Sequence, residues 1–384
     1  MTLSEFFDKL FLQYIFKNLA VTYCRLYFFV FMLKTDIRSI LVRVPNWIGD
    51  AVLCLPALEA LKTDYPKAEI TVLARPWVSP VFLNDPFVKE VIDYDALGRH
   101  HGIVGKWRLI RELKKNSFDM AVLFQNAFEA ALIAFLTRIP IRVGYATDLR
   151  GRLLSHPVKS DQEIRKTHQV FYYLNIVAHI SKSHQPSAIS HQPKIYLIAE
   201  EKKWAEDFLQ GKGIGDNIVV GIAPGASYGP AKRWMPEGFG EVARRLVDGY
   251  EAKVILFGGK DDRSICKDVL NGMQGINLAG EVDLRKSIAL LSRCNLFITN
   301  DSGLMHIAAS LGVPIIAIFG STDPKLTGPL GDNVRIIKKG IECSPCFERE
   351  CKYGHYNCMK MITAQDVYDA ATAFLERKGM LEGA

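Results

Sequence analysis

From residue 38 onward, short apolar runs alternate along the chain with longer amphipathic segments. Short apolar runs bounded by turn residues indicate buried strands, and apolar positions three or four residues apart indicate helices. Alternation of the two with short connections predicts parallel sheets that carry helices on both faces. The strands expected in the first half are 39–46, 69–76, 119–126 and 141–146.

A polar segment at residues 181–194, rich in Ser, His and Pro, interrupts this pattern and is typical of a linker. The strands expected after it are 217–225, 252–259, 276–280, 296–301 and 314–320. A chain of 384 residues is long enough for two such domains. We therefore predict an α/β protein with two Rossmann-like domains, at 37–185 and 186–384. Ligands of such sheets bind beyond the carboxyl ends of the strands, so we expect the domains to face each other across one cleft.

The first 36 residues do not follow this pattern. The run 26–33 is apolar but short, and charged residues such as Lys17 and Arg25 precede it. A membrane-spanning helix needs about 20 mostly apolar residues, and a secretory signal ends in a small-residue cleavage site, so neither fits well. Three interpretations stay open: a helix on a membrane surface, an extra packed helix, or a true start at Met32. We favour the surface helix.

The net charge of +7 is spread over the chain rather than gathered in one basic run. It suits an anionic substrate or an anionic lipid surface, and equally an ordinary basic surface. We find no nucleic-acid-binding motif and expect no nucleic-acid partner. Four cysteines lie in apolar or helical stretches and indicate buried thiols of a reducing compartment. They are Cys24, Cys54, Cys266 and Cys294.

The first predicted strand ends in a turn that contains Gly49, and a helix is expected to begin at about Asp50. A glycine at such a turn lets the backbone approach a ligand closely. Asp50 could simply cap the helix and favour its dipole. Its position at the mouth of the predicted cleft also suits a general base.

The second domain begins with a strand that runs into a small, basic loop at 223–234. The loop combines two glycines with Ser227 and Lys232, a set of groups that suits a phosphate. A flexible surface loop with ordinary basic residues would have the same composition. Neither a GxGxxG turn after the first strand nor a Walker loop is present, so hydride transfer and nucleoside-triphosphate hydrolysis are poorly supported.

The segment 299–306 joins another predicted strand to a helix. Free backbone N–H groups at the start of that helix would point into the cleft and form an anion site. These groups belong to Ser302, Gly303 and Leu304. Asp301 would repel a phosphate, so it fits a sugar hydroxyl better, unless it caps the helix. His306 lies one turn further and could equally be a core histidine bonded to the backbone.

Together these segments resemble glycosyltransferase family 9, which includes the lipopolysaccharide heptosyltransferases. The matching segments are LVRVPNWIGDAVLCLPAL (41–58), PGASYGPAKRW (224–234), TNDSGLMHIAASLGVPIIAIFGSTDP (299–324) and CSPCFERECKYGHYNCMKMIT (343–363). The resemblance covers residues 38–375 and leaves the extension unexplained. It implies a GT-B fold and an inverting transfer of L-glycero-D-manno-heptose from ADP-heptose. The implied acceptor is the first heptose of the lipopolysaccharide inner core, at the cytoplasmic face of the inner membrane.

The resemblance also implies roles for single residues. Asp50 matches the position of the family's proposed base, Lys232 matches the lysine that approaches the donor phosphates, and Ser227 matches the hydroxyl of that loop. Asp301 is assigned to the heptose hydroxyls and His306 to support of the site. The backbone of three residues is assigned to phosphate, namely Ser302, Gly303 and Leu304. The ribose contact is not fixed, and Asp261 and Asp262 are guesses from their strand-end position. No DxD-like metal motif stands out, so we expect no required cofactor.

Four cysteines cluster near the C-terminus, within 343–358, and His355 lies among them. They are Cys343, Cys346, Cys351 and Cys358. One CxxC pair with two further thiols could complete a tetrahedral zinc site. The second pair lacks the short spacing of a zinc ribbon, so reduced thiols that pack a loop, or one disulfide, are alternatives.

Three other functions compete with heptose transfer to this acceptor. A family relative could use another acceptor or another donor sugar. A GT-B-fold epimerase would work on a nucleotide sugar without an acceptor. A non-catalytic protein would bind the nucleotide sugar and would not need Asp50 to face it.

Overall fold

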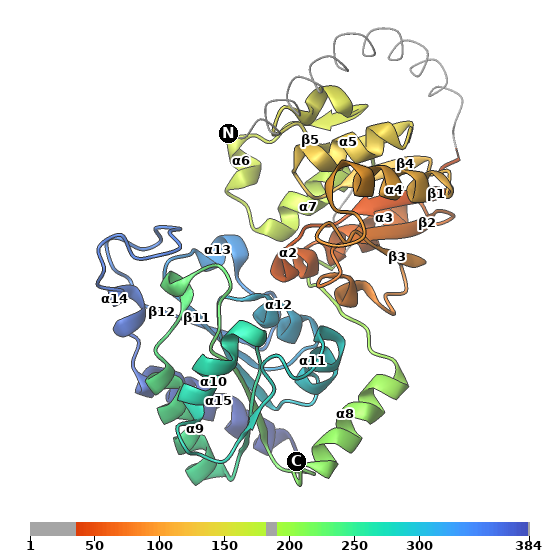
Figure 1. The fold of residues 1–384 in the computed structure, drawn as a ribbon. Coiled ribbons are helices and arrows are strands. Elements are labelled where there is room, and N and C mark those ends of the chain that lie inside the picture. Colours follow the sequence, from red (N-terminus) through yellow and green to blue (C-terminus); the bar gives the residue numbers. More distant parts are fainter. Residues whose placement is uncertain (1–35, 182–189, 383–384) are drawn as a thin grey trace.

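The computed structural model describes residues 36–181 and 190–382, and side chains as far as residue 376. The predictions for residues 1–35 and for much of the linker lie outside the described residues. The described chain forms two α/β lobes, each built on a sheet of six parallel strands (Figure 1). The N-terminal lobe is coloured red to yellow in Figure 1, and the C-terminal lobe green to blue.

The sheet of the N-terminal lobe has the strand order β3-β2-β1-β4-β5-β6. Its strands are β1 (Ser39–Arg43), β2 (Glu69–Ala74), β3 (Glu90–Asp93), β4 (Met120–Leu123), β5 (Ile141–Tyr145) and β6 (His156–Val158). The helical segments around it are α2 (Ile48–Leu53), α3 (Leu55–Asp64), η1 (Ser79–Phe82), α4 (Gly102–Lys114), α5 (Phe128–Leu136), η2 (Arg150–Leu153), α6 (Gln162–Arg165) and α7 (Gln169–Ala178). In the centre of the sheet Val42 pairs in register with Val72 and Val122, and all three are fully buried. Burial on both faces explains why these strands read as continuous apolar runs.

The sheet of the C-terminal lobe has the strand order β12-β11-β10-β7-β8-β9. Its strands are β7 (Val219–Ala223), β8 (Lys253–Leu256), β9 (Ile276–Asn277), β10 (Leu296–Asn300), β11 (Ile315–Phe319) and β12 (Val334–Lys338). The helical segments are α8 (Ala199–Gly211), η4 (Pro230–Lys232), α9 (Pro236–Tyr250), η5 (Lys260–Asp262), α10 (Arg263–Leu270), α11 (Leu284–Leu291), α12 (Gly303–Ser310), α13 (Pro324–Thr327), α14 (Asn357–Lys360) and α15 (Ala364–Glu382). The core under α9 is apolar and contains the fully buried Trp234, Phe239 and Leu246.

The α/β fold class is confirmed, and each strand named from the sequence is present in shortened form. The sequence analysis missed three strands at or near the sheet edges, namely β3, β6 and β12. In the part of the chain that the structure describes, no helix has the length and apolar character needed to cross a membrane.

The two lobes meet where α2 packs against α12. Each helix follows an inner strand of its sheet, β1 and β10 respectively. A Cβ added to Gly303 would lie 2.9 Å from the Cβ of Ile48, and one added to Gly49 would lie 2.9 Å from Cδ2 of His306. The glycines therefore permit a close approach that no larger residue would allow without movement. This contact brings the carboxyl ends of the two inner strands together.

Candidate active site

Asp50 lies in the first turn of α2, directly after the turn that follows β1. Trp47 occupies the N-cap position without a side-chain cap bond, so Asp50 does not cap the helix in the strict sense. Burial raises the pKa of Asp50 to about 6, while a hydrogen bond from Tyr173 and the charge of Lys232 act in the opposite direction. Lys232 belongs to the other lobe, so Asp50 already experiences the charges of the facing domain.

The basic loop after β7 is held in place by Asn300 at the end of β10. The side chain of Asn300 is buried, accepts a hydrogen bond from the N–H of Trp234 at 3.0 Å and donates one to the carbonyl of Pro224 at 2.7 Å. These two bonds fix both ends of the loop that contains Lys232. Ser227, in the same loop, is exposed.

Lys232 and Asp301 form an ion pair, with 2.5 Å between Nζ and Oδ2. Both side chains are largely buried, at 13% and 5% exposure. The hydroxyl of Thr322 donates a hydrogen bond of 2.6 Å to the same carboxylate oxygen. Because a buried charge is costly without a partner, the ion pair and this hydrogen bond offset the cost of burying both side chains at the base of the site.

The helix α12 begins beside this pair and follows Asp301. Ser302 is its N-cap, and Gly303 and Leu304 form its first turn. The Oγ of Ser302 lies 3.3 Å from Oγ1 of Thr299 rather than capping the helix. The first backbone N–H groups of the helix therefore have no side-chain cap, and they supply the positive end of the helix dipole to the site.

His306 lies one turn into α12 and contacts the other lobe at Gly49. Burial lowers the pKa of His306 to about 4, so the imidazole is neutral at physiological pH. Its Nδ1 has no hydrogen-bond partner among the described residues. The histidine thus packs the contact between the lobes rather than adding charge to the site.

The structure brings together six of the predicted site residues from both lobes: Asp50, Lys232, Asp301, Ser302, Gly303 and His306. Leu304 follows on the same turn of α12, and Ser227 sits on the rim of the loop. The sequence analysis assigned no role to Tyr173, Thr322 or Asn300, which bond the charged groups or fix their loop, although Asn300 and Thr322 lie within the segment 299–324. A polar residue at a strand end was a usable signal for Asn300. No sequence pattern singles out Tyr173, which comes from α7.

The side chain of Asp262, which the sequence analysis offered for the ribose contact, bonds within its own loop. Its Oδ2 accepts a hydrogen bond from the N–H of Gly259 at 2.9 Å. A Cβ on Gly225 would overlap this carboxylate, so Asp262 lies directly against the loop after β7. Asp261 is exposed beside it.

The cysteine-rich segment lies against the loops of the site. The N–H of Ala231 donates to the carbonyl of Arg349 at 3.0 Å, and the hydroxyl of Tyr228 donates to the carbonyl of Phe347 at 2.7 Å. The segment therefore braces the loop that contains Lys232.

The cysteines themselves are free thiols, so the disulfide alternative is not realised here. The imidazole of His355 lies 4.0 Å from Sγ of Cys343 and 3.9 Å from Sγ of Cys351. Among the described residues no group of three such side chains is arranged to hold a metal ion. Zinc binding stays a prediction, and metal analysis of freshly reduced protein tests it.

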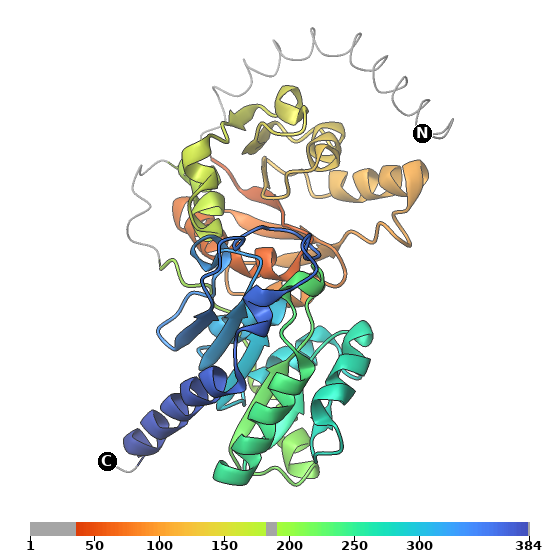
Figure 2. The same ribbon diagram turned by 90° about the vertical axis from the view of Figure 1, so that its left-hand side faces the viewer.

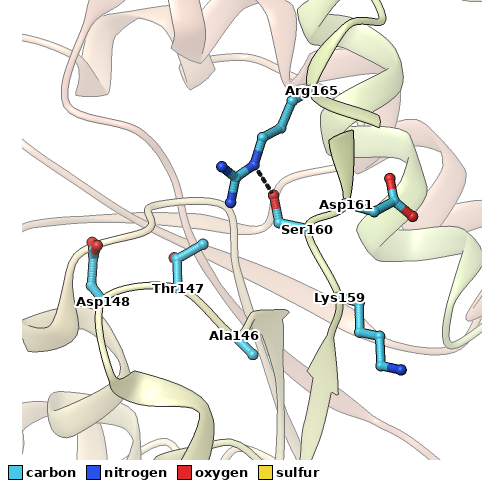
Figure 3. A pocket seen from close by; sticks show the side chains of 7 residues that line it. All are labelled: Ala146, Thr147, Asp148, Lys159, Ser160, Asp161 and Arg165. Atoms are coloured by element: carbon cyan, nitrogen blue, oxygen red, sulfur yellow. Dashed lines mark hydrogen bonds between the residues drawn. The ribbon is translucent and has the colours of Figure 1, made fainter. Parts of the chain in front are cut away.

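A hollow of about 560 Å³ lies elsewhere on the N-terminal lobe, beyond the ends of β5 and β6 (Figure 3). Its lining residues are Ala146, Thr147, Asp148, Lys159, Ser160, Asp161 and Arg165. Figure 3 shows Arg165 turned toward Ser160, and its Nε donates a hydrogen bond of 2.9 Å to that hydroxyl. None of the predicted site residues lines this hollow.

Known proteins resemble the chain over most of its length. It is 30% identical over 356 residues to lipopolysaccharide heptosyltransferase 2 of Salmonella typhimurium. The alignment covers 89% of this chain and all of that protein. It is 30% identical over 350 residues to the protein of the same name from Escherichia coli K12, with coverage of 88% and 98%.

Solved structures agree with this relationship. The ADP-heptose lps heptosyltransferase II of Escherichia coli superposes with a TM-score of 0.76 at 28% identity, over 89% of this chain and 99% of that one. The glycosyl transferase family 9 protein of Veillonella parvula gives a TM-score of 0.78 at 27% identity, over 90% and 99%. The fold is therefore GT-B. The model of glycosyltransferase family 9 (heptosyltransferase) matches residues 106–357, and we conclude that the chain is a glycosyltransferase that belongs to this family.

Proposed function

We propose that the chain transfers L-glycero-D-manno-heptose from ADP-heptose to the first heptose of the lipopolysaccharide inner core, with inversion at the anomeric carbon. The observation that carries the proposal is the placement of a carboxylate, Asp50, opposite Lys232 and the start of α12 on the facing lobe. The donor and acceptor classes follow from relatives at 30% identity that bear the name lipopolysaccharide heptosyltransferase 2.

Inverting transfer is a single displacement at the anomeric carbon. In the proposed reaction Asp50 takes the proton of an acceptor hydroxyl, whose oxygen attacks the anomeric carbon as the bond to the ADP oxygen breaks. The proton ends on Asp50, and the leaving ADP carries the negative charge. A raised pKa makes Asp50 a stronger base than an ordinary aspartate while leaving it ionised near neutral pH.

The leaving diphosphate needs positive charge on the other side of the bond. Lys232 and the free N–H groups of Ser302, Gly303 and Leu304 supply it from the C-terminal lobe. Asp301 holds Lys232 in the free protein. We assign Asp301 to the heptose hydroxyls in the complex, where it also keeps the ammonium of Lys232 in place. Since these groups supply the charge that a bound metal would otherwise give, we expect chelation of divalent cations to leave the rate unchanged.

The proposed acceptor is joined to a lipid, so we place the reaction on the cytoplasmic face of the inner membrane, with the enzyme peripheral to it. The net charge of +7 supports attraction to an anionic surface. No described helix is suited to cross the membrane.

The deciding experiment measures ADP release from ADP-heptose with and without an acceptor that carries lipid A, Kdo and one heptose. We expect ADP only with this acceptor, together with a gain of one heptose in acceptor mass. Turnover without acceptor would favour an epimerase, and transfer only to other acceptors would favour a different family activity. Tight ADP binding without any turnover would leave a non-catalytic binder.

The role of Asp50 is tested separately with Asp50→Asn, which keeps the shape of the side chain and removes its basicity. We expect transfer to fall by at least about a thousandfold while ADP affinity stays within about threefold of wild type. Loss of ADP binding in this variant would contradict the assignment, because the donor groups lie on the other lobe.

A further inference from the structure

Helix α4 exposes large apolar side chains to solvent. Ile103, Val104 and Trp107 are 57%, 76% and 45% exposed, and Leu97 in the preceding loop is 80% exposed. Single exposed apolar residues are ordinary, but four that lie close along one loop and helix mark an interaction surface. The transfer chemistry proposed above uses none of them.

Cations share the same face of the helix. Besides Gly102, the exposed residues from the start of α4 to its C-cap are Ile103, Val104, Trp107, Arg108, Arg111, Lys114 and Lys115, and none is acidic. At 3.6 residues per turn these positions span about 140° of arc, so they form one continuous stripe. The opposite side is buried through Leu109, Ile110 and Leu113. The apolar residues occupy the first two turns of the stripe, and the cations follow them.

The neighbouring carboxylates do not neutralise this stripe. Glu112 pairs with Arg99 and with the buried His100. Glu129, on α5, pairs with Lys106. Within residues 36–181 and 190–376, no ion pair is recorded for the four cations of the stripe, Arg108, Arg111, Lys114 and Lys115. The stripe therefore carries a net positive charge next to exposed apolar surface.

The position of α4 relates this surface to the site. Because β3 and β1 are parallel strands of one sheet, the loop after β3 leaves from the same edge as the turn that leads to Asp50. Leu97 lies in that loop, and α4 begins where the loop ends, at Gly102. Figure 2 shows α4 as the orange helix that projects from the side of the upper lobe, away from the C-terminal lobe. The surface is thus free of the other lobe.

We propose that this face of α4, together with Leu97, docks on an anionic lipid bilayer. The indole and the aliphatic side chains would enter the interfacial region, and the cations would bind lipid phosphates. A helix with an apolar patch and an unneutralised cationic patch matches this surface better than an uncharged protein partner. The inference is independent of the sugar that is transferred, since vesicle binding needs neither donor nor acceptor.

The test is co-sedimentation of the full chain with vesicles of phosphatidylethanolamine and phosphatidylglycerol, and with vesicles of phosphatidylcholine alone. We expect binding to the anionic vesicles that weakens as salt rises. Val104→Asp, and separately the double variant Arg111→Glu with Lys114→Glu, should each weaken binding about tenfold or more. Circular dichroism, followed through thermal unfolding, reports whether the variants are folded.

Matched controls place the same charges elsewhere. Leu149→Asp changes a side chain that is 93% exposed on the same lobe. Lys202→Glu with Lys203→Glu reverses two exposed lysines on α8. Both should bind within about twofold of wild type. Wild-type binding by the α4 variants, or no binding by the unaltered chain, would overturn the proposal. If only the charge-reversal variant lost vesicle binding, the contact would be purely electrostatic, without insertion of the apolar side chains. That result would also overturn the proposal.

Discussion

At the scale of single residues, two opposing effects act on the pKa of Asp50. Burial raises its pKa to about 6, whereas the hydrogen bond from Tyr173 and the charge of Lys232 favour the ionised form. The result is a carboxylate that is ionised near neutral pH and still more basic than one in water. In the folded protein Asp50 therefore binds a proton more strongly than an aspartate in water does, at some cost in stability.

The pH dependence of transfer should reflect the raised pKa of Asp50. A protonated Asp50 cannot accept a proton, so kcat/KM should fall as the pH drops below about 6. Tyr173→Phe removes a hydrogen bond that favours the carboxylate, so the acidic limb should move to higher pH. Initial rates from pH 5 to 8 at saturating ADP-heptose would measure both curves. If the acidic limb of the pH–rate curve stayed at the same pH in Tyr173→Phe, the hydrogen bond from Tyr173 to Asp50 would be contradicted.

The same aspartate should affect stability. Its pKa is 3.8 in the unfolded reference and about 6 in the folded protein, so the folded state binds the proton more strongly. The free energy of unfolding then falls as pH rises from about 4 to about 6, and stays reduced above that range. Because Asp50 keeps part of its surface exposed, we expect a gain of only about 2 kcal/mol for Asp50→Asn at pH 7.5. Chemical denaturation should show this gain, and it should vanish near pH 4.

At the scale of elements, the close crossing of α2 and α12 sets the distance between the two halves of the site. In Gly49→Ala the added methyl group would lie 2.9 Å from the ring of His306, which must move. We expect kcat/KM to fall by about tenfold, because small misplacements of reacting groups are costly. ADP affinity should change little.

Gly211→Ala on α8 is the matched control, since a Cβ there meets no atom within 4 Å. Steady-state kinetics and ADP titration of both variants separate a loss of lobe contact from a general effect of adding a methyl group. Equal kcat/KM for Gly49→Ala and wild type would contradict this prediction, because it would show that the contact between α2 and α12 accommodates a methyl group without loss of activity.

The predictability of the elements follows from their burial. The strands β1, β4, β7, β10 and β11 are almost fully buried and read as apolar runs, so the sequence identified them. By contrast most residues of β3 and β12 are only partly buried or exposed, and β6 is only three residues long and contains Pro157. Strands of this kind lack the apolar run, and only pairing with a neighbour defines them.

At the scale of the whole molecule, the site consists of groups from two lobes that the chain order keeps far apart. The sequence could identify Asp50, Lys232 and the turn at 301–306 because each lies at the end of a strand, and parallel strands place their ends at one edge. It could not identify Tyr173 or Thr322. Tyr173 lies inside α7, and Thr322 follows the end of β11 but is a neutral residue that nothing in the local sequence connects with Asp301. The contacts that give both residues their importance form only after folding.

A second whole-molecule feature joins the lobes through Arg285 on α11. Its guanidinium pairs with Glu201 of α8, with 2.5 Å between Nε and Oε1, and donates to the carbonyl of Pro80 in the N-terminal lobe at 3.2 Å. Both side chains of the pair are mostly buried. Arg285→Met removes the only cation paired with Glu201 among the described residues and leaves its carboxylate with neutral hydrogen-bond donors, so we expect the free energy of unfolding to fall by about 3 kcal/mol.

The adjacent Lys286 provides the matched control. It is half exposed and pairs with Asp283 only at 3.8 Å, so Lys286→Met should change stability by less than about 0.5 kcal/mol. Because Arg285 contacts both lobes, its loss should also separate their unfolding. Differential scanning calorimetry should then resolve two transitions in Arg285→Met where wild type and Lys286→Met show one. A single transition at a lower temperature would mean that Arg285 is not needed to couple the lobes, and that other contacts between them, such as α2 with α12 and His168 with the carbonyl of Gly328, are sufficient.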